Sequence, residues 1–142
     1  MLPDNLHGLQ ALVRGRDDDT IYEGIGRQGV DAVLAHVSLT LLPGNVAPEG
    51  GGDAQGVVQF VLSTLDGERH LWVSRDGGVV TAGVGHAEGA RTTFTMTLAD
   101  LLRLLANESG KDVAAQVSAG SMRVSGDETM ADAFPGWFRL PD

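Results

Sequence analysis

The sequence TTFTMTLADLLRLL, residues 92–105, joins a β-strand pattern directly to an α-helix pattern. In its first half the large side chains of Phe94 and Met96 alternate with threonines. A period of two residues is that of a strand with one bulky face and one hydroxyl-bearing face. We therefore expect a strand over residues 92–97.

The second half of this stretch predicts a capped helix. Thr97-Leu98-Ala99-Asp100 fits the start pattern in which the hydroxyl accepts from the backbone N–H three residues on and the acidic side chain reaches back. Leucines then recur at the spacing of one helix face. They are Leu98, Leu101, Leu102 and Leu105. The same pattern puts Arg103 and Asn107 on the solvent side, and Gly110 should end the helix.

Three further alternating segments precede this stretch. They cover residues 57–64, 69–74 and 79–84. Asp66-Gly67 and Asp76-Gly77-Gly78 separate them, and such residues supply the positive backbone angles of tight turns. The order predicts an antiparallel meander.

Helical patterns flank these strands on both sides. An apolar stripe begins at Val30 and recurs through Leu41, where Pro43-Gly44 should stop the helix. Residues 111–118 predict a second, weaker helix ending at Gly120. A fifth strand is expected over residues 121–125, followed by an apolar stripe that Pro135-Gly136 interrupts. That stripe comprises Met130, Phe134, Trp137 and Phe138.

Composition narrows the class of protein. A length of 142 residues suits one domain, residues 1–142, in which residues 1–19 with their Asp17-Asp18-Asp19 run are expected to be a flexible tail. A net charge of -9 disfavours nucleic acid as a partner, and the absence of cysteine excludes disulfides and thiolate metal sites. No apolar run is long enough for stable membrane insertion, and no leader is recognisable. We expect a cytoplasmic protein.

In element order the chain resembles the sterol carrier protein 2 family over roughly residues 30–140. The residues that carry the resemblance are Phe60, Trp72, the junction at residues 96–101 and the segment at residues 120–127. The resemblance implies an α+β fold: a five-stranded, mostly antiparallel sheet with helices packed on one face. It also implies an apolar tunnel that binds fatty acyl chains, acyl-CoA or sterols without chemistry. Pro135-Gly136 departs from the family pattern.

Large apolar side chains of the converging segments are the candidate lining of such a tunnel. They are Phe60, Trp72, Phe94, Met96, Leu101, Leu105, Met122, Met130, Phe134, Trp137 and Phe138. Each taken singly is better explained by an ordinary core than by a ligand site. Flexible methionine thioethers in three of these segments suit a cavity that accepts ligands of variable shape.

Motifs for other chemistry are weak. Residues 24–29 spell GxGxxG, but no buried strand precedes them, so a Gly-rich turn is the better interpretation than dinucleotide binding. His7, His36, His70 and His86 lack the spacing of metal ligands on one helix face. We therefore expect no metal and no cofactor. No GxSxG nucleophile motif occurs.

The sequence thus predicts a non-catalytic domain whose partner is a small apolar or lipid ligand. Two alternatives stay open. The first is an accessory or dimerisation domain with a filled core and no ligand, including a homodimer that buries Trp137 and Phe138. The second is an enzyme that acts on a hydrophobic substrate with His70 or His86 as base.

Overall fold

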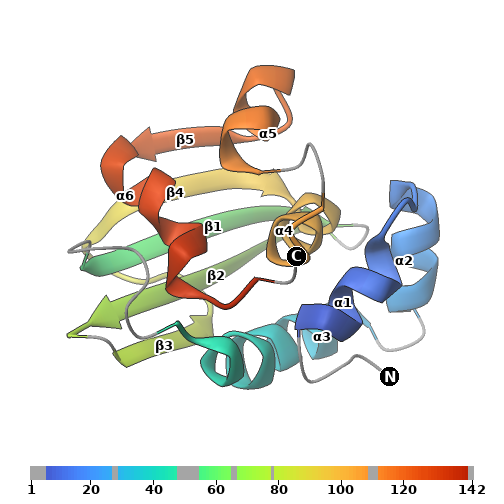
Figure 1. Cartoon of the computed structure of the whole chain (residues 1–142), viewed down its shortest axis with the longest axis horizontal. Coiled ribbons are helices and arrows are strands. Elements are labelled where there is room, and N and C mark those ends of the chain that lie inside the picture. Colours follow the sequence, from blue (N-terminus) through green and yellow to red (C-terminus); the bar gives the residue numbers. More distant parts are fainter. Residues whose placement is uncertain are drawn as a thin grey trace.

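A five-stranded mixed sheet in the order β3-β2-β1-β4-β5 forms one layer of the molecule (Figure 1). The computed structural model describes residues 6–26, 29–47, 55–64, 67–77, 79–108 and 112–140. The strands are β1 (Gly56–Thr64), β2 (Gly67–Asp76), β3 (Val79–Val84), β4 (Ala90–Thr97) and β5 (Arg123–Gly126). Strands β1 to β3 form the predicted antiparallel meander, β5 is antiparallel to β4, and β1 and β4 are parallel. The prediction of a mostly antiparallel sheet is confirmed.

Strand register gives the sheet one apolar face. Phe60 lies opposite Leu71 on β2 and Phe94 on β4, and all three are fully buried. Because side chains alternate along a strand, their neighbours Gln59 and Trp72, which lie opposite each other, point to the other face. Of the two predicted turns, Gly67 and Gly77 have positive φ, whereas Asp66 and Gly78 lie outside the described residues.

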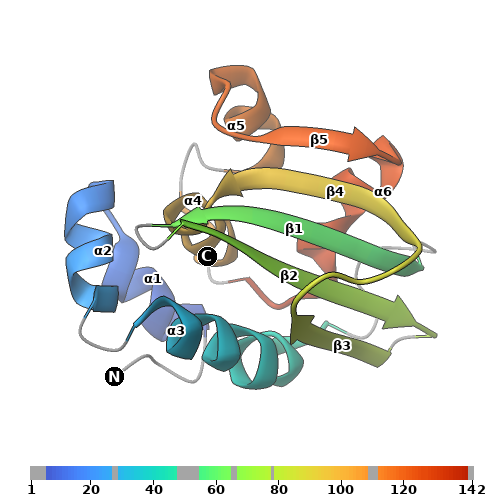
Figure 2. The same cartoon turned by 180° about the vertical axis from the view of Figure 1, so that it is seen from behind.

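The apolar face is covered by helices, on which further helices pack. The described helices are α1 (Leu6–Val13), α2 (Asp18–Gly26), α3 (Val30–His36), α4 (Leu98–Leu105), α5 (Val113–Ala119) and α6 (Glu128–Ala133). Of these, α1 packs on α4, and α2 packs on α3 and α4. Figure 1 shows α4 and α6 in front of the sheet, and Figure 2 shows the opposite face with no helix across β1, β2 or β4. The expected arrangement, with helices on one face only, is confirmed. No described helix is long and apolar enough to cross a membrane.

One of the two hydrogen bonds predicted for the cap of α4 is present. Thr97 Oγ1 accepts from the Asp100 backbone N–H at 3.1 Å, as the start pattern requires. The Asp100 carboxylate does not reach back but accepts from Arg103 Nη1 at 2.8 Å. Placing Arg103 on the solvent side was wrong, because its side chain is buried beside Asp100, Asp18 and Glu108. Asn107 is exposed as predicted, but the predicted helix end at Gly110 was wrong: α4 ends at Leu105, and Asn107 takes the left-handed conformation (φ 54) that terminates a helix. Gly110 itself lies outside the described residues.

The N-terminal segment is not a flexible tail over its described part. Helix α1 buries Leu6, Leu9 and Val13, and Gln10 Nε2 donates to the Ala106 carbonyl at 3.2 Å. Helix α1 therefore packs on α4, a partner that is distant in sequence. The prediction failed because the apolar cluster is too short to show a helical period by itself.

Other boundaries shift by a few residues. Helix α3 continues as a π-helical turn, Val37–Leu41, and ends before Pro43 as predicted. Helix α5 starts at its cap Asp112 and ends at the left-handed Gly120, whereas Lys111 lies outside the described residues. Strand β5 begins at Arg123 and not at residue 121, because the backbone N–H groups of Ser121 and Met122 both donate to the Gln116 carbonyl.

The chain ends in a short apolar helix and a turn. Helix α6 is capped by Asp127, and a 3-10 turn, η3 (Phe134–Trp137), follows it directly. Pro135 sits in the first turn of η3, where its missing N–H is tolerated. The predicted interruption of the last apolar stripe is confirmed.

Candidate functional site

The candidate site is the apolar layer between the sheet and helices α4, α5, α6 and η3. Because side chains alternate along a strand, Phe60, Phe94 and Met96 point from the sheet into this layer. The opposite side comes from Leu101 and Leu105 on α4 and from the C-terminal segment. Of the predicted lining, the side chains fully or almost fully buried in one cluster are Phe60, Phe94, Met96, Leu101, Leu105, Met122, Met130, Phe134, Trp137 and Phe138. We call this set the apolar layer.

Aromatic rings occupy the middle of the apolar layer. Phe60 and Phe94 stack with ring centroids 5.1 Å apart. The Phe134 centroid lies 5.2 Å from that of Phe60 in a T-shaped arrangement and 5.8 Å from that of Phe94 in a tilted one. Trp137 and Phe138 each lie 5.4 Å from Phe134. Phe134 is therefore the common contact of the sheet rings and the C-terminal rings.

Backbone hydrogen bonds attach this C-terminal turn to the segment after α3. The Ala47 N–H donates to the Trp137 carbonyl, and the Arg139 N–H donates to the Asn45 carbonyl, both at 2.8 Å. Phe138 forms an isolated bridge with Val46. These contacts join residues 45–47 to residues 137–139.

The charged side chain of Arg75 contacts the apolar layer at Trp137. Arg75, on the buried face of β2, is 5% exposed, and its Cζ lies 5.9 Å from the centroid of the Trp137 ring. The Trp137 Nε1–H is buried without a hydrogen-bond partner. Sequence reasoning missed Arg75, although it follows Leu71 and Val73 at the period of the buried face and could have been found from that spacing.

Trp72 does not join the apolar layer. It lies on the opposite face of the sheet, over Gly83, where a Cβ added to the glycine would stand 2.6 Å from Trp72 Cζ2. Gln59 on the same face is 2% exposed, and it bonds to Gly85 and Ala87 of the connection between β3 and β4. Figure 2 shows this connection crossing in front of the sheet. The Gln59 amide donates to the Leu71 and Gly85 carbonyls and accepts from the Ala87 N–H.

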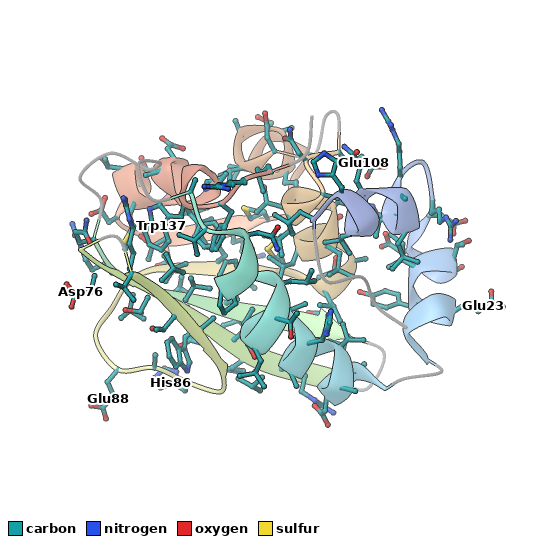
Figure 3. The ribbon with its side chains drawn as sticks, turned by 60° about the horizontal axis from the view of Figure 1, so that its bottom comes forward. Glu23, Asp76, His86, Glu88, Glu108 and Trp137 are labelled. Carbon is teal, nitrogen blue, oxygen red and sulfur yellow. The ribbon has the colours of Figure 1, made fainter. Side chains whose placement is uncertain are left out.

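The two histidines considered as bases also lie on this outer face. His70 pairs in register with Val61, and its ring centroid is 6.3 Å from that of His86. His70 Nε2 is 3.0 Å from Glu68 Oε2. Figure 3 shows His86 and Trp137 on opposite sides of the sheet. The histidine pair therefore does not face the apolar layer, and the described residues contain no cluster of three or more groups that could hold a metal ion.

A small pocket opens where β1 and β4 end side by side. Its volume is about 180 Å³. It is lined by Ser63, Thr95, Met96, Thr97, Gly120, Ser121 and Arg123. We call it the strand-end pocket. Met96 is the one lining residue that also belongs to the buried core. The polar residues that line the strand-end pocket are common residue types on separate elements, so no sequence motif marks them.

The GxGxxG stretch has the structure of a helix connection. Its first glycines lie in the last turn of α2, and Gly29 adopts φ +84 immediately before α3. A helix precedes it, not a buried strand, as the Gly-rich turn interpretation requires. Arg27 and Gln28 lie outside the described residues.

These features define an α+β domain with the sterol carrier protein 2 fold. Among solved structures, palmitated SCP2L2 from Aedes aegypti matches with a TM-score of 0.54 and 20% identity, over 75% of this chain and 90% of that one. The inverting sec-alkylsulfatase Pisa1 from Pseudomonas sp. matches with a TM-score of 0.63 and 18% identity over 92% of this chain. This chain spans only 19% of the sulfatase chain. The sequence matches no protein-family model and no curated protein.

Proposed function

We propose that this domain reversibly binds the alkyl portion of a lipid-like ligand within the apolar layer and carries out no chemistry on it. The observation that carries the proposal is the apolar layer itself, enclosed between the sheet and helices in the fold that a palmitated protein shares. A site of this kind needs no polar residue, since each buried methylene contributes roughly 0.8 kcal/mol.

Binding requires that the ligand replace aromatic side chains. Phe134, Trp137 and Phe138 belong to one short segment, so a single displacement of η3 would vacate the middle of the layer. Exposing three such rings costs about 1.5–3 kcal/mol each, and burying ten methylenes returns about 8 kcal/mol. The two magnitudes are similar. We therefore expect modest affinity that rises with chain length.

Native mass spectrometry and displacement of a fluorescent fatty acid from delipidated protein test the proposal. We expect one alkyl ligand per chain and tighter binding of longer chains. Trp72→Phe is the matched control, because it changes an aromatic residue outside the layer. Absence of binding by every fatty acid and sterol up to high micromolar concentration contradicts the proposal.

A second candidate is an accessory domain that has a filled core and no ligand. Two observations favour it: the ring contacts around Phe134, and the match to a fifth of a larger enzyme chain. In its homodimer form it would use Trp137 and Phe138, which are only 0% and 4% exposed within one chain. Sedimentation velocity distinguishes the monomeric form of this accessory domain from its homodimer. In either form, failure to bind any alkyl probe supports the accessory domain over the lipid-binding domain.

A further inference from the structure

The buried face of β2 ends in a cation. Leu71, Val73 and Arg75 alternate along this face, and Arg75 is 5% exposed. The next residue, Asp76, is the exposed last residue of β2. In Figure 3, Asp76 lies toward the same end of the molecule as Trp137. Arg75 therefore stands at the rim of the sheet, and the buried face leads inward from it.

Apolar side chains connect this cation to the centre of the apolar layer. Val73 and Leu71 follow Arg75 on the same face, and both are fully buried. Leu71 lies opposite Phe60 in the sheet register, and the Phe60 ring stacks on that of Phe94. An alkyl chain laid along this face would have one end at the two rings and the other at the guanidinium of Arg75.

Arg75 is the buried charge that the sheet directs to the apolar layer. Among the described residues, the buried charged side chains are Arg75, Asp100 and Arg103. Asp100 and Arg103 both lie on α4 and pair with each other at 2.8 Å. A guanidinium keeps its charge inside a protein and can form paired hydrogen bonds to a carboxylate, sulfate or phosphate.

The indole of Trp137 occupies the place beside this guanidinium. Arg75 Cζ lies 5.9 Å from the ring centroid, which is within the range of a cation–π contact. The indole Nε1–H is buried without a hydrogen-bond partner among the described residues, which makes the closed position of the ring less favourable. If an alkyl ligand displaces η3, Arg75 loses the indole. A neutral chain would then leave the guanidinium against methylenes, whereas an anionic headgroup would replace the lost contact.

We propose that the ligand is an anionic amphiphile whose carboxylate, sulfate or phosphate group pairs with Arg75 where the Trp137 indole lies in the closed layer. The inference rests on the proposed function, since it needs the alkyl chain to enter the apolar layer. It adds a direction to that function: the headgroup stays at the rim of the sheet, and the methyl end points toward Phe60 and Phe94. It also adds a selectivity for anions, which the net charge of -9 would by itself disfavour.

The test compares ligands of one chain length and different charge. Dodecanoate, monododecyl phosphate and 1-dodecanol are titrated into the full chain below their micellar concentrations, and the wild type should bind both anions more tightly than dodecanol. Arg75→Met keeps an unbranched side chain and removes the charge. It should weaken the anions about tenfold, which corresponds to roughly 1.4 kcal/mol, and leave dodecanol at least as tightly bound. Arg75→Lys should recover part of the loss. Arg14→Met removes an equal charge from an exposed position and should leave all three affinities unchanged.

A measurement on the wild-type chain keeps the inference testable if Arg75→Met does not fold. The NMR signal of the Arg75 Nε–H, assigned by its loss in Arg75→Lys, should shift with dodecanoate and much less with dodecanol. If all three ligands bind equally well and the Arg75 signal does not distinguish them, the headgroup inference is overturned and the proposed function stands. If none of the three binds, the proposed function itself fails, and the headgroup inference fails with it.

Discussion

Arg103 brings a positive charge into the interior of the helical layer. Its guanidinium is 2.8 Å from Asp100 and 2.5 Å from Asp18, and it also donates to the Arg16 carbonyl. Burial alone would lower the pKa of Arg103, but the hydrogen bonds to Asp100 and Asp18 outweigh it and raise the pKa. The side chain is therefore a charged link between α4 and the N-terminal helices.

Replacing this link by a neutral side chain should destabilise the fold. We expect Arg103→Met to lower the free energy of unfolding by about 3 kcal/mol, because Asp100 is left buried without its partner. Urea unfolding followed by tryptophan fluorescence measures the change. Arg139→Met, at an exposed position, is the control and should stay within about 0.5 kcal/mol of the wild type. Equal stability of the two variants would show that the Arg103 contacts are unimportant.

Trp72 and Gly83 form a second pair whose role can be isolated. A methyl group at Gly83 would overlap the indole, so Gly83→Ala should cost about 1–3 kcal/mol and shift tryptophan emission as Trp72 moves toward solvent. In a Trp72→Leu background the same change should cost much less. A double-mutant cycle measures this difference, and additive effects would contradict direct contact.

At the scale of the elements, helix α1 packs on α4. Leu9 is fully buried, so we expect Leu9→Ala to lower the free energy of unfolding by about 3 kcal/mol. Ala11→Ser, on the exposed side of the same helix, should be nearly neutral. Thermal and urea unfolding provide the measurement, and a neutral Leu9→Ala would restore the interpretation of this segment as a tail.

The connection between β3 and β4 depends on one side chain. Gln59→Leu removes the hydrogen bonds to the Leu71 and Gly85 carbonyls and from the Ala87 N–H, which we expect to cost about 2 kcal/mol. Hydrogen exchange at the Ala87 amide should accelerate more than exchange in α4. Thr93→Val, on the same sheet face, is the control. Unchanged exchange at Ala87 would mean that other contacts hold the connection.

The sequence predicted those helices and strands in which apolar residues repeat regularly. It did not predict the direction of side chains whose partners are distant in sequence. The alternation from residue 92 to 97 and the leucine spacing after it predicted the existence of β4 and α4 and the junction between them, whereas the helix end, expected at Gly110, lies at Leu105. Arg103 was misplaced because a charged residue counts as solvent-facing in a helical pattern, whereas its partners come from α2 and the end of α4. Trp72 needed the β1–β2 register, which fixes whether it points with Phe60 or with Gln59.

At the scale of the whole molecule, the proposed alkyl binding requires the apolar layer to open around Phe134. Phe134→Ala should lower the free energy of unfolding by about 3–5 kcal/mol and leave a space bounded by Phe60, Phe94 and Trp137. If an alkyl chain binds there, the variant no longer has to displace the ring. Its affinity for dodecanoate should then rise at least severalfold.

Isothermal titration and the ligand-induced rise in melting temperature measure this effect. Trp72→Phe should leave dodecanoate affinity unchanged. Equal affinity of Phe134→Ala and the wild type would place any alkyl ligand outside the apolar layer, and loss of binding would show that the ring itself contacts the ligand.

The parallel pairing of β1 with β4 also constrains the order in which the chain can fold. The β1–β2–β3 meander needs only neighbouring segments, but β1 gains its second partner only when residues 90–97 are present. Helix α1 can pack only at a still later stage, because Gln10 bonds to Ala106, which lies 96 positions later in the sequence. Long-range contacts of this kind slow folding. During synthesis α1 leaves the ribosome before α4, so it can pack only after residues 98–106 have emerged.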